Sequence, residues 1–174
     1  MIKFLKQYMP KKPIKRGYKV WMRCDSSGFA CEFQIYTGKT EEVEINLGER
    51  VIKNLSQKLL GKNHVLFLDN YFTYDLLKYL ETQNITACGT VNISRKSLPK
   101  NLLEDKKMKR GDFDWSISNE DIACIKWKDK RIVHILTTLD EAIKSYEVER
   151  KEKDGKIIKI ACPKAIIDYN KNMG

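Results

Sequence analysis

The sequence predicts an α/β (α+β) protein in which helices pack on a mixed β-sheet. Up to about residue 95 the strand and helix patterns alternate in the order β-β-α-β-α-β, which is typical of such a sheet. A β-rich block without helical periodicity then follows, from about residue 96 to 162. The chain has 174 residues, 42% of them hydrophobic, so we expect a single folded domain that can carry a small inserted subdomain.

The first elements are a hairpin, a helix and a buried strand. Residues 18–24 and 29–36 are rich in aromatic and β-branched residues, and the turn-forming sequence DSSG separates them. Within residues 50–60, Val51 and Leu55 share one helical face, and a glycine stop signal follows the segment. Residues 65–68 form a short apolar run, which is typical of a buried parallel strand.

A second helix and strand complete this first part. Thr73 is placed to cap a helix over residues 74–83, and Leu76, Leu77 and Leu80 lie on one of its faces. Residues 87–91 predict another buried strand.

The β-rich block ends in a hairpin and a helix. Asp154 and Gly155 predict a tight hairpin turn, and Pro163 stands where a first helical residue would be. The alternating strand patterns cover residues 113–117, 122–128, 132–137, 146–151 and 156–162. The chain is thus divided into a first core segment (1–95), a β-rich block (96–162) and the start of a final helix (163–174).

Positive charge dominates the composition. The 33 Lys+Arg residues against 23 Asp+Glu residues give a net charge of +10. No run approaches the roughly 18 apolar residues that a membrane span needs, and the N-terminus lacks the apolar region of a signal peptide. We therefore expect a soluble, intracellular protein without a membrane partner.

The first 23 residues carry eight cations and no acidic residue. We expect an extended basic arm that could follow a nucleic-acid backbone by releasing counterions. The alternative is a solvated terminus without a partner, and charge alone does not separate the two. The candidate nucleic-acid-binding residues are Lys11, Lys12, Lys15, Arg16 and Lys19.

The cysteines and histidines favour structural roles. Five scattered cysteines without a C-x-x-C pair fit neither a disulfide framework nor a zinc site, so we expect reduced and mostly buried thiols. His64 and His134 lie in strand-like runs, where packing is the expected role.

Asp69 is the strongest candidate in the sequence for a catalytic or metal-binding residue. It follows the apolar run of residues 65–68, and the carboxyl edge of a sheet is where sites gather in open α/β proteins. The alternative is that Asp69 or Asn70 only satisfies a turn or caps the next helix. Asp25 is expected to do ordinary turn chemistry.

Five stretches in order resemble the transposase domain of the piggyBac family, over essentially the whole chain. They are PKKPIKRGYKVWMRCDSSGF, FLDNYFTYDLLKYL, ACGTVNISRKSLPKNL, KRGDFDWSISNEDIACIKWKDKRIVHILTTL and DYNKNMG. The resemblance implies an RNase H-like fold in which three aspartates hold two Mg²⁺ ions for DNA strand cleavage and transfer. Asp69 matches the second of these aspartates, and residues 96–162 match the family's insertion domain.

The family's other two aspartates have no counterpart in this sequence. The first should stand upstream of Met1 and the third after Gly174. One exposed carboxylate does not hold Mg²⁺ well against its hydration shell. We therefore expect a fragment that binds no metal at useful affinity and is inactive alone, with a domesticated, non-catalytic DNA-binding module as the alternative. The resemblance further implies a nuclear location, DNA as the partner and a homodimer in the intact family.

Overall fold

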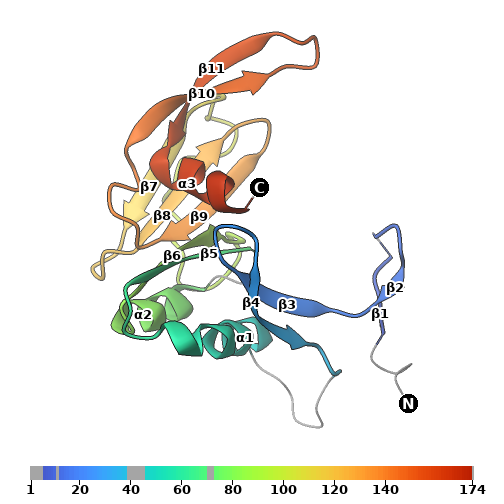
Figure 1. Cartoon of the computed structure of the whole chain (residues 1–174). Coiled ribbons are helices and arrows are strands. Elements are labelled where there is room, and N and C mark those ends of the chain that lie inside the picture. The colour runs from blue at the N-terminus through green and yellow to red at the C-terminus, as the bar shows by residue number, and fades with distance from the viewer. Residues whose placement is uncertain (1–5, 11, 39–45, 70–72, 174) are drawn as a thin grey trace. The chain divides into compact units, whose positions relative to one another are not determined.

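The computed structural model describes residues 6–10, 12–38, 46–69 and 73–173 (Figure 1). The chain divides into two compact units, Met1–Lys58 and Leu59–Gly174. Both contain helices and strands, so the predicted α+β class is confirmed. None of the helices in the described ranges is long and apolar enough to cross a membrane.

The first unit is built on a hairpin and one helix. Strands β3 (Val20–Cys24) and β4 (Ala30–Ile35) pair antiparallel, as predicted. Asp25 makes the expected turn, since its Oδ1 accepts from the amides of Ser27 and Phe29 at 2.8 and 3.1 Å. Helix α1 (Leu47–Ser56) follows and tightens into the 3₁₀ helix η2 (Gln57–Leu59).

The helix α1 is tied to this hairpin. Its buried residues include Val51 and Ile52, and the Arg23 Nε of β3 donates to the Leu55 carbonyl at 2.8 Å. Two short strands, β1 (Gln7–Tyr8) and β2 (Arg16–Gly17), pair antiparallel near the start of the unit.

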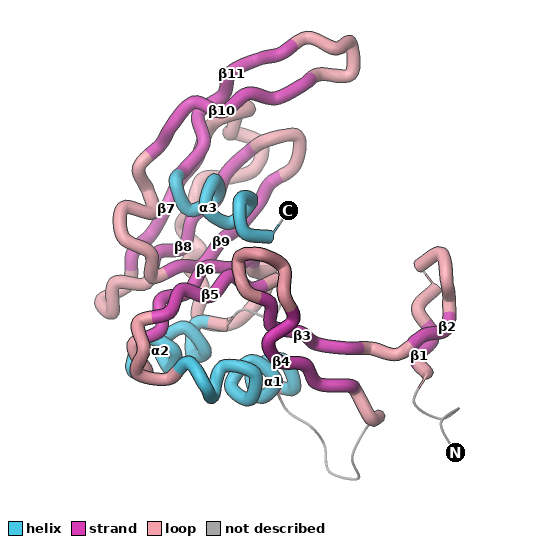
Figure 2. The backbone as a smooth tube through the Cα atoms, viewed as in Figure 1, coloured by secondary structure: helices cyan, strands magenta, loops and turns pink. Residues whose placement is uncertain are grey.

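The second unit is built on a five-stranded mixed sheet in the order β5-β6-β9-β8-β7. Strands β5 and β6 pair parallel, and the remaining neighbours pair antiparallel. Figure 2 draws the strands in magenta. The bounds are β5 (His64–Leu68), β6 (Ile85–Thr90), β7 (Phe113–Ile117), β8 (Ala123–Lys128) and β9 (Ile132–Thr137).

Helices cover the two faces of this sheet. On one face, α3 (Lys164–Met173) buries Ala165 and Ile166 in a core that includes Cys88, Ile125 and Ile135. Because side chains alternate along a strand, Cys124 and Leu136 face the opposite side. Helix α2 (Tyr74–Thr82) packs on β6 and buries leucines at 76, 77 and 80, as predicted.

Two sequence-based boundaries can be set beside the structure. Strands β7, β8 and β9 continue the sheet begun by β5 and β6, so no break in the sheet falls at residue 95. The assignment of residues 96–162 to the family's insertion stays a prediction. Pro163 does not begin α3, because it is the last residue of β11 (Ile157–Pro163) and still pairs with Ser145 of β10 (Ser145–Lys151).

Candidate functional site

Asp69 lies where β5 ends, at the carboxyl edge of the parallel β5–β6 pair. The register pairs Leu68 with Gly89, so the residues that follow, Asp69 and Thr90, meet at the same edge. The Thr90 Oγ1 donates to the Asp69 Oδ1 at 3.1 Å. Asp69 itself is exposed. The parallel pair therefore places a solvent-facing carboxylate beside a hydroxyl group.

Tyr169 of α3 reaches the same carboxylate. Ala165 is completely buried against the sheet, and Tyr169 follows it by one helical turn on the same face. The Tyr169 hydroxyl lies 3.5 Å from the Asp69 Oδ1. Burial raises the pKa of Tyr169, and the Asp69 charge adds to this effect, while a hydrogen bond with Thr90 acts in the opposite direction. Asp69, Thr90 and Tyr169 thus form one cluster of connected oxygens, called here the Asp69 cluster.

The capping role considered for Asp69 belongs to another residue. The amide of Leu76 donates to the Thr73 Oγ1 at 3.1 Å, which makes Thr73 the cap of α2 as the sequence predicted. Within the described ranges, the Asp69 carboxylate accepts from side-chain hydroxyls rather than from backbone amides. Asn70, the other candidate for a turn or cap, lies outside the described residues.

The Asp69 cluster supplies one carboxylate for a metal ion. Mg²⁺ commonly binds one or two carboxylates together with waters and substrate phosphates, so Asp69 fits as one ligand of such a set. Across the described parts of the chain, no three His, Cys, Asp or Glu side chains gather as a metal site. Thr90 and Tyr169 contribute neutral oxygens beside it.

The basic segment of the first unit is folded rather than extended. Strands β1 and β2 pair across a turn in which the Met9 amide donates to the Lys15 carbonyl at 2.7 Å. Lys12, Lys15 and Arg16 are exposed on this small hairpin. The predicted extended arm is therefore wrong in shape, although its cations remain accessible.

Lys19 differs from the other candidate cations. Its Nζ lies 4.8 Å from the ring centroid of Trp21 and 5.6 Å from that of Tyr36, so it packs on two aromatic rings of the β3–β4 hairpin. Lys11 lies outside the described residues. Of the five candidate cations, those at 12, 15 and 16 are exposed within the described ranges.

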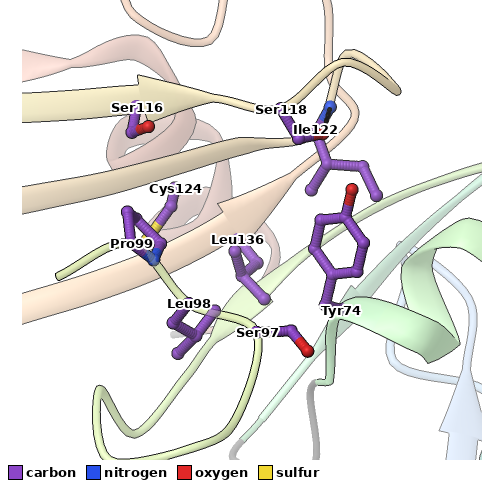
Figure 3. A pocket seen from close by; sticks show the side chains of 9 residues that line it. All are labelled: Tyr74, Ser97, Leu98, Pro99, Ser116, Ser118, Ile122, Cys124 and Leu136. Atoms are coloured by element: carbon purple, nitrogen blue, oxygen red, sulfur yellow. Dashed lines mark hydrogen bonds between the residues drawn. The ribbon is translucent and has the colours of Figure 1, made fainter.

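A recess that the sequence did not indicate lies on the face of the sheet opposite α3 (Figure 3). Its volume is about 390 Å³. The Tyr74 hydroxyl, at one side of it, donates to the Glu120 carboxylate, which Lys78 also contacts at 2.9 Å. The residues that line it are Tyr74, Ser97, Leu98, Pro99, Ser116, Ser118, Ile122, Cys124 and Leu136. The lining has no carboxylate, so this recess is not a candidate metal site.

The cysteines and histidines behave mostly as expected. Cys88, Cys124 and Cys162 are buried free thiols, and burial raises their pKa values to about 12, 11 and 11. Cys24 and Cys31 are exposed, so burial holds for three of the five. Both histidines lie on strands, His64 on β5 and His134 on β9.

Comparison with known proteins identifies the family. The family profile described as Transposase IS4 matches residues 4–174. The chain belongs to this transposase family. Human PiggyBac transposable element-derived protein 3 is 32% identical to it over 181 residues, which is 97% of this chain and 30% of that protein. Human PiggyBac transposable element-derived protein 2 is 30% identical over 141 residues, covering 75% of this chain and 24% of the relative.

A solved structure supports the same assignment. The chain matches the cryo-EM structure of a piggyBac transposase synaptic complex with hairpin DNA, with a TM-score of 0.79 and 27% identity. The match covers 98% of this chain and 35% of the other. The predicted RNase H-like fold and piggyBac resemblance are confirmed: this is a piggyBac transposase-derived domain. It spans between about a quarter and a third of the length of these three proteins.

Proposed function

We propose that this chain forms part of the catalytic core of a Mg²⁺-dependent DNA strand-cleavage and strand-transfer enzyme, with Asp69 as one metal ligand. The observation that carries the proposal is the position of Asp69, an exposed carboxylate at the carboxyl edge of the parallel strands of a transposase-like sheet. When bound, Mg²⁺ supplies charge stabilisation for the attacking and leaving oxygens of an in-line phosphoryl displacement. The chain's own contribution is to hold one anionic ligand at a fixed place on a rigid sheet.

Metal binding at Asp69 is tested with Mn²⁺ alone as a paramagnetic probe. A single carboxylate should hold the ion only weakly, so the titration reaches millimolar Mn²⁺. At these concentrations Mn²⁺ should broaden the amide resonances of Leu68 and Gly89, which lie beside Asp69 in the 174-residue chain. Asp69→Asn should abolish this broadening, and Asp75→Asn, which removes an exposed carboxylate from α2, should not. Broadening that survives in Asp69→Asn, or none in the wild type at millimolar Mn²⁺, would refute the assignment of Asp69 as a ligand.

We also propose that the 174-residue polypeptide on its own neither cuts nor joins DNA. The Asp69 cluster brings together a single carboxylate, while two-ion chemistry on phosphates uses several. A cleavage assay on duplex and hairpin DNA with Mg²⁺ or Mn²⁺ should show no product. Metal-dependent nicking or joining that is lost in Asp69→Ala would refute this part of the proposal.

DNA is the partner that the charge of the chain supports. The net charge is +10, and the cations at 12, 15 and 16 are exposed on the β1–β2 hairpin. The matched solved structure is a complex with hairpin DNA. We also propose, from the resemblance to the family, a nuclear location and homodimer formation. They are tested by imaging a tagged protein and by its mass in solution.

The second candidate is a domesticated DNA-binding module without chemistry. The same exposed cations favour it, since they need no metal site to bind phosphates. The two candidates differ in the effect of Asp69→Asn. It should change metal binding in the first, whereas in the second only substitutions of the basic hairpin should matter.

A further inference from the structure

Two hydroxyl groups from different elements converge on the same oxygen of Asp69. Thr90 comes from β6 and Tyr169 from α3, and both reach Oδ1, at 3.1 and 3.5 Å. Oδ2 accepts no hydrogen bond from any residue in the described ranges. Within the described ranges, both side-chain contacts to the carboxylate are therefore made at Oδ1.

This arrangement matters because an aspartate carboxylate is poorly fixed by its own torsions. Its terminal χ2 rotation is broad and roughly two-fold, so an exposed carboxylate exchanges its two oxygens freely. Two donors on one oxygen select a single orientation. Hydrogen-bonded partners of this kind orient ligating carboxylates in metal sites, and their loss typically costs about 10–100-fold in metal affinity.

The two donors are themselves held rigidly. Cys88 lies two residues before Thr90, on the same face of β6. It is fully buried, and its thiol contacts the Ala165 carbonyl of α3 at 3.7 Å. Ala165 and Ile166 anchor α3 in the core, with 0% and 2% of their surfaces exposed. The position of the Tyr169 hydroxyl is thus set by the docking of α3 on the sheet.

From this geometry we infer that Thr90 and Tyr169 are positioning residues, which hold Asp69 through Oδ1 and so fix the orientation in which its carboxylate meets the metal ion. The inference rests on the proposed function, since it concerns how Asp69 acts as a ligand. Thr90 has the shorter contact and makes the larger contribution. Neither hydroxyl touches the reacting atoms.

The test compares hydroxyl deletions by NMR. The variants are Thr90→Val, Thr90→Ser, Tyr169→Phe and a control, Tyr146→Phe, which removes an exposed hydroxyl from β10. In the metal-free chain at neutral pH, Thr90→Val and Tyr169→Phe should shift the Asp69 side-chain ¹³C resonance, and Tyr146→Phe should not. This first readout needs neither metal nor activity.

Mn²⁺ alone gives the second readout, through the broadening at Leu68 and Gly89. Thr90→Val should weaken apparent Mn²⁺ affinity about tenfold and Tyr169→Phe somewhat less. Thr90→Ser should restore the affinity, because it keeps the hydroxyl. Rescue by serine separates positioning from a general loss of packing, and it keeps the test decisive if Tyr169→Phe loosens α3.

The outcomes separate the two proposals. Abolished broadening in Asp69→Asn together with unchanged affinity in Thr90→Val and Tyr169→Phe would overturn the positioning roles and leave Asp69 as a ligand. An affinity loss in Thr90→Val that serine does not rescue would also overturn them. Broadening unaffected by Asp69→Asn would overturn the proposed function and, with it, this inference.

Discussion

If the β1–β2 hairpin binds a phosphate backbone, removing its cations should flatten the salt dependence of DNA binding. The perturbation is the triple substitution of Lys12, Lys15 and Arg16 to Gln, which removes the three exposed cations at 12, 15 and 16. Each phosphate contact on B-DNA contributes about 0.9 to the slope of log K against log salt, so three contacts contribute about 2.7. Between about 50 and 200 mM salt, this corresponds to a roughly 40-fold smaller loss of affinity in the variant.

The assay is fluorescence anisotropy of a short labelled duplex, read at several salt concentrations. A matched control replaces three exposed lysines at the tip of the β10–β11 hairpin, Lys151, Lys153 and Lys156, also by Gln. The control loses the same charge but keeps the proposed contact residues on the β1–β2 hairpin. It should therefore weaken DNA binding less and keep most of the salt-dependence slope. Equal salt-dependence slopes in the two variants would refute a specific contact by the β1–β2 hairpin. A slope that stays at the wild-type value in the first variant would favour the alternative, a solvated terminus without a partner.

Three further predictions concern stability and reactivity. Trp127→Phe should destabilise the second unit by about 1–3 kcal/mol, because the Trp127 Nε1 donates to the Ala161 carbonyl at 2.8 Å; an unchanged urea midpoint would contradict this. The Tyr74 hydrogen bond and then Lys78 lower the pKa of Glu120 from its ordinary 4.5. Ionised Glu120 therefore stabilises the fold above that value and loses its effect as the pH falls through the lowered pKa, so the gap in urea midpoint between wild type and Glu120→Gln should close on acidification and not on raising the pH. A thiol reagent at pH 8 should modify two cysteines quickly and the other three only after denaturation, and a third fast thiol would show that the core opens. The fast pair is Cys24 and Cys31, and the protected thiols are Cys88, Cys124 and Cys162.

Local elements could be predicted from the sequence because their signals are local. The helix α2 has its cap at Thr73 and its apolar face at 76, 77 and 80, all within a few turns. The DSSG turn likewise contains both the acceptor, Asp25, and one of the amides that it binds, Ser27. In such segments the chain's neighbours in sequence are also its neighbours in space.

Pairings between strands that lie far apart in the sequence were harder to predict. The helical periodicity of the sequence ends near residue 96. Strand β9 nevertheless pairs with β6 and extends the same sheet, with Cys88 opposite Thr137. The alternation of apolar and polar residues predicts which face of the sheet each side chain lies on, but it does not predict which strand pairs with which. The basic segment shows a similar limit, since its charge predicted accessibility while the pairing of β1 with β2 depends on backbone hydrogen bonds.

The candidate site combines both situations. Asp69 could be found from the strand that precedes it, because a carboxylate after an apolar run is a visible pattern. Its partners stand 21 and 100 residues away, and neutral hydroxyls carry no charge pattern that would mark them. Tyr169 packs against the core from the last helix, and the same placement brings its hydroxyl to Asp69. The orientation of the Asp69 carboxylate therefore depends on how α3 packs on the sheet. A substitution that loosens Ala165 or Ile166 in the core should also disturb Asp69 at the edge of the sheet.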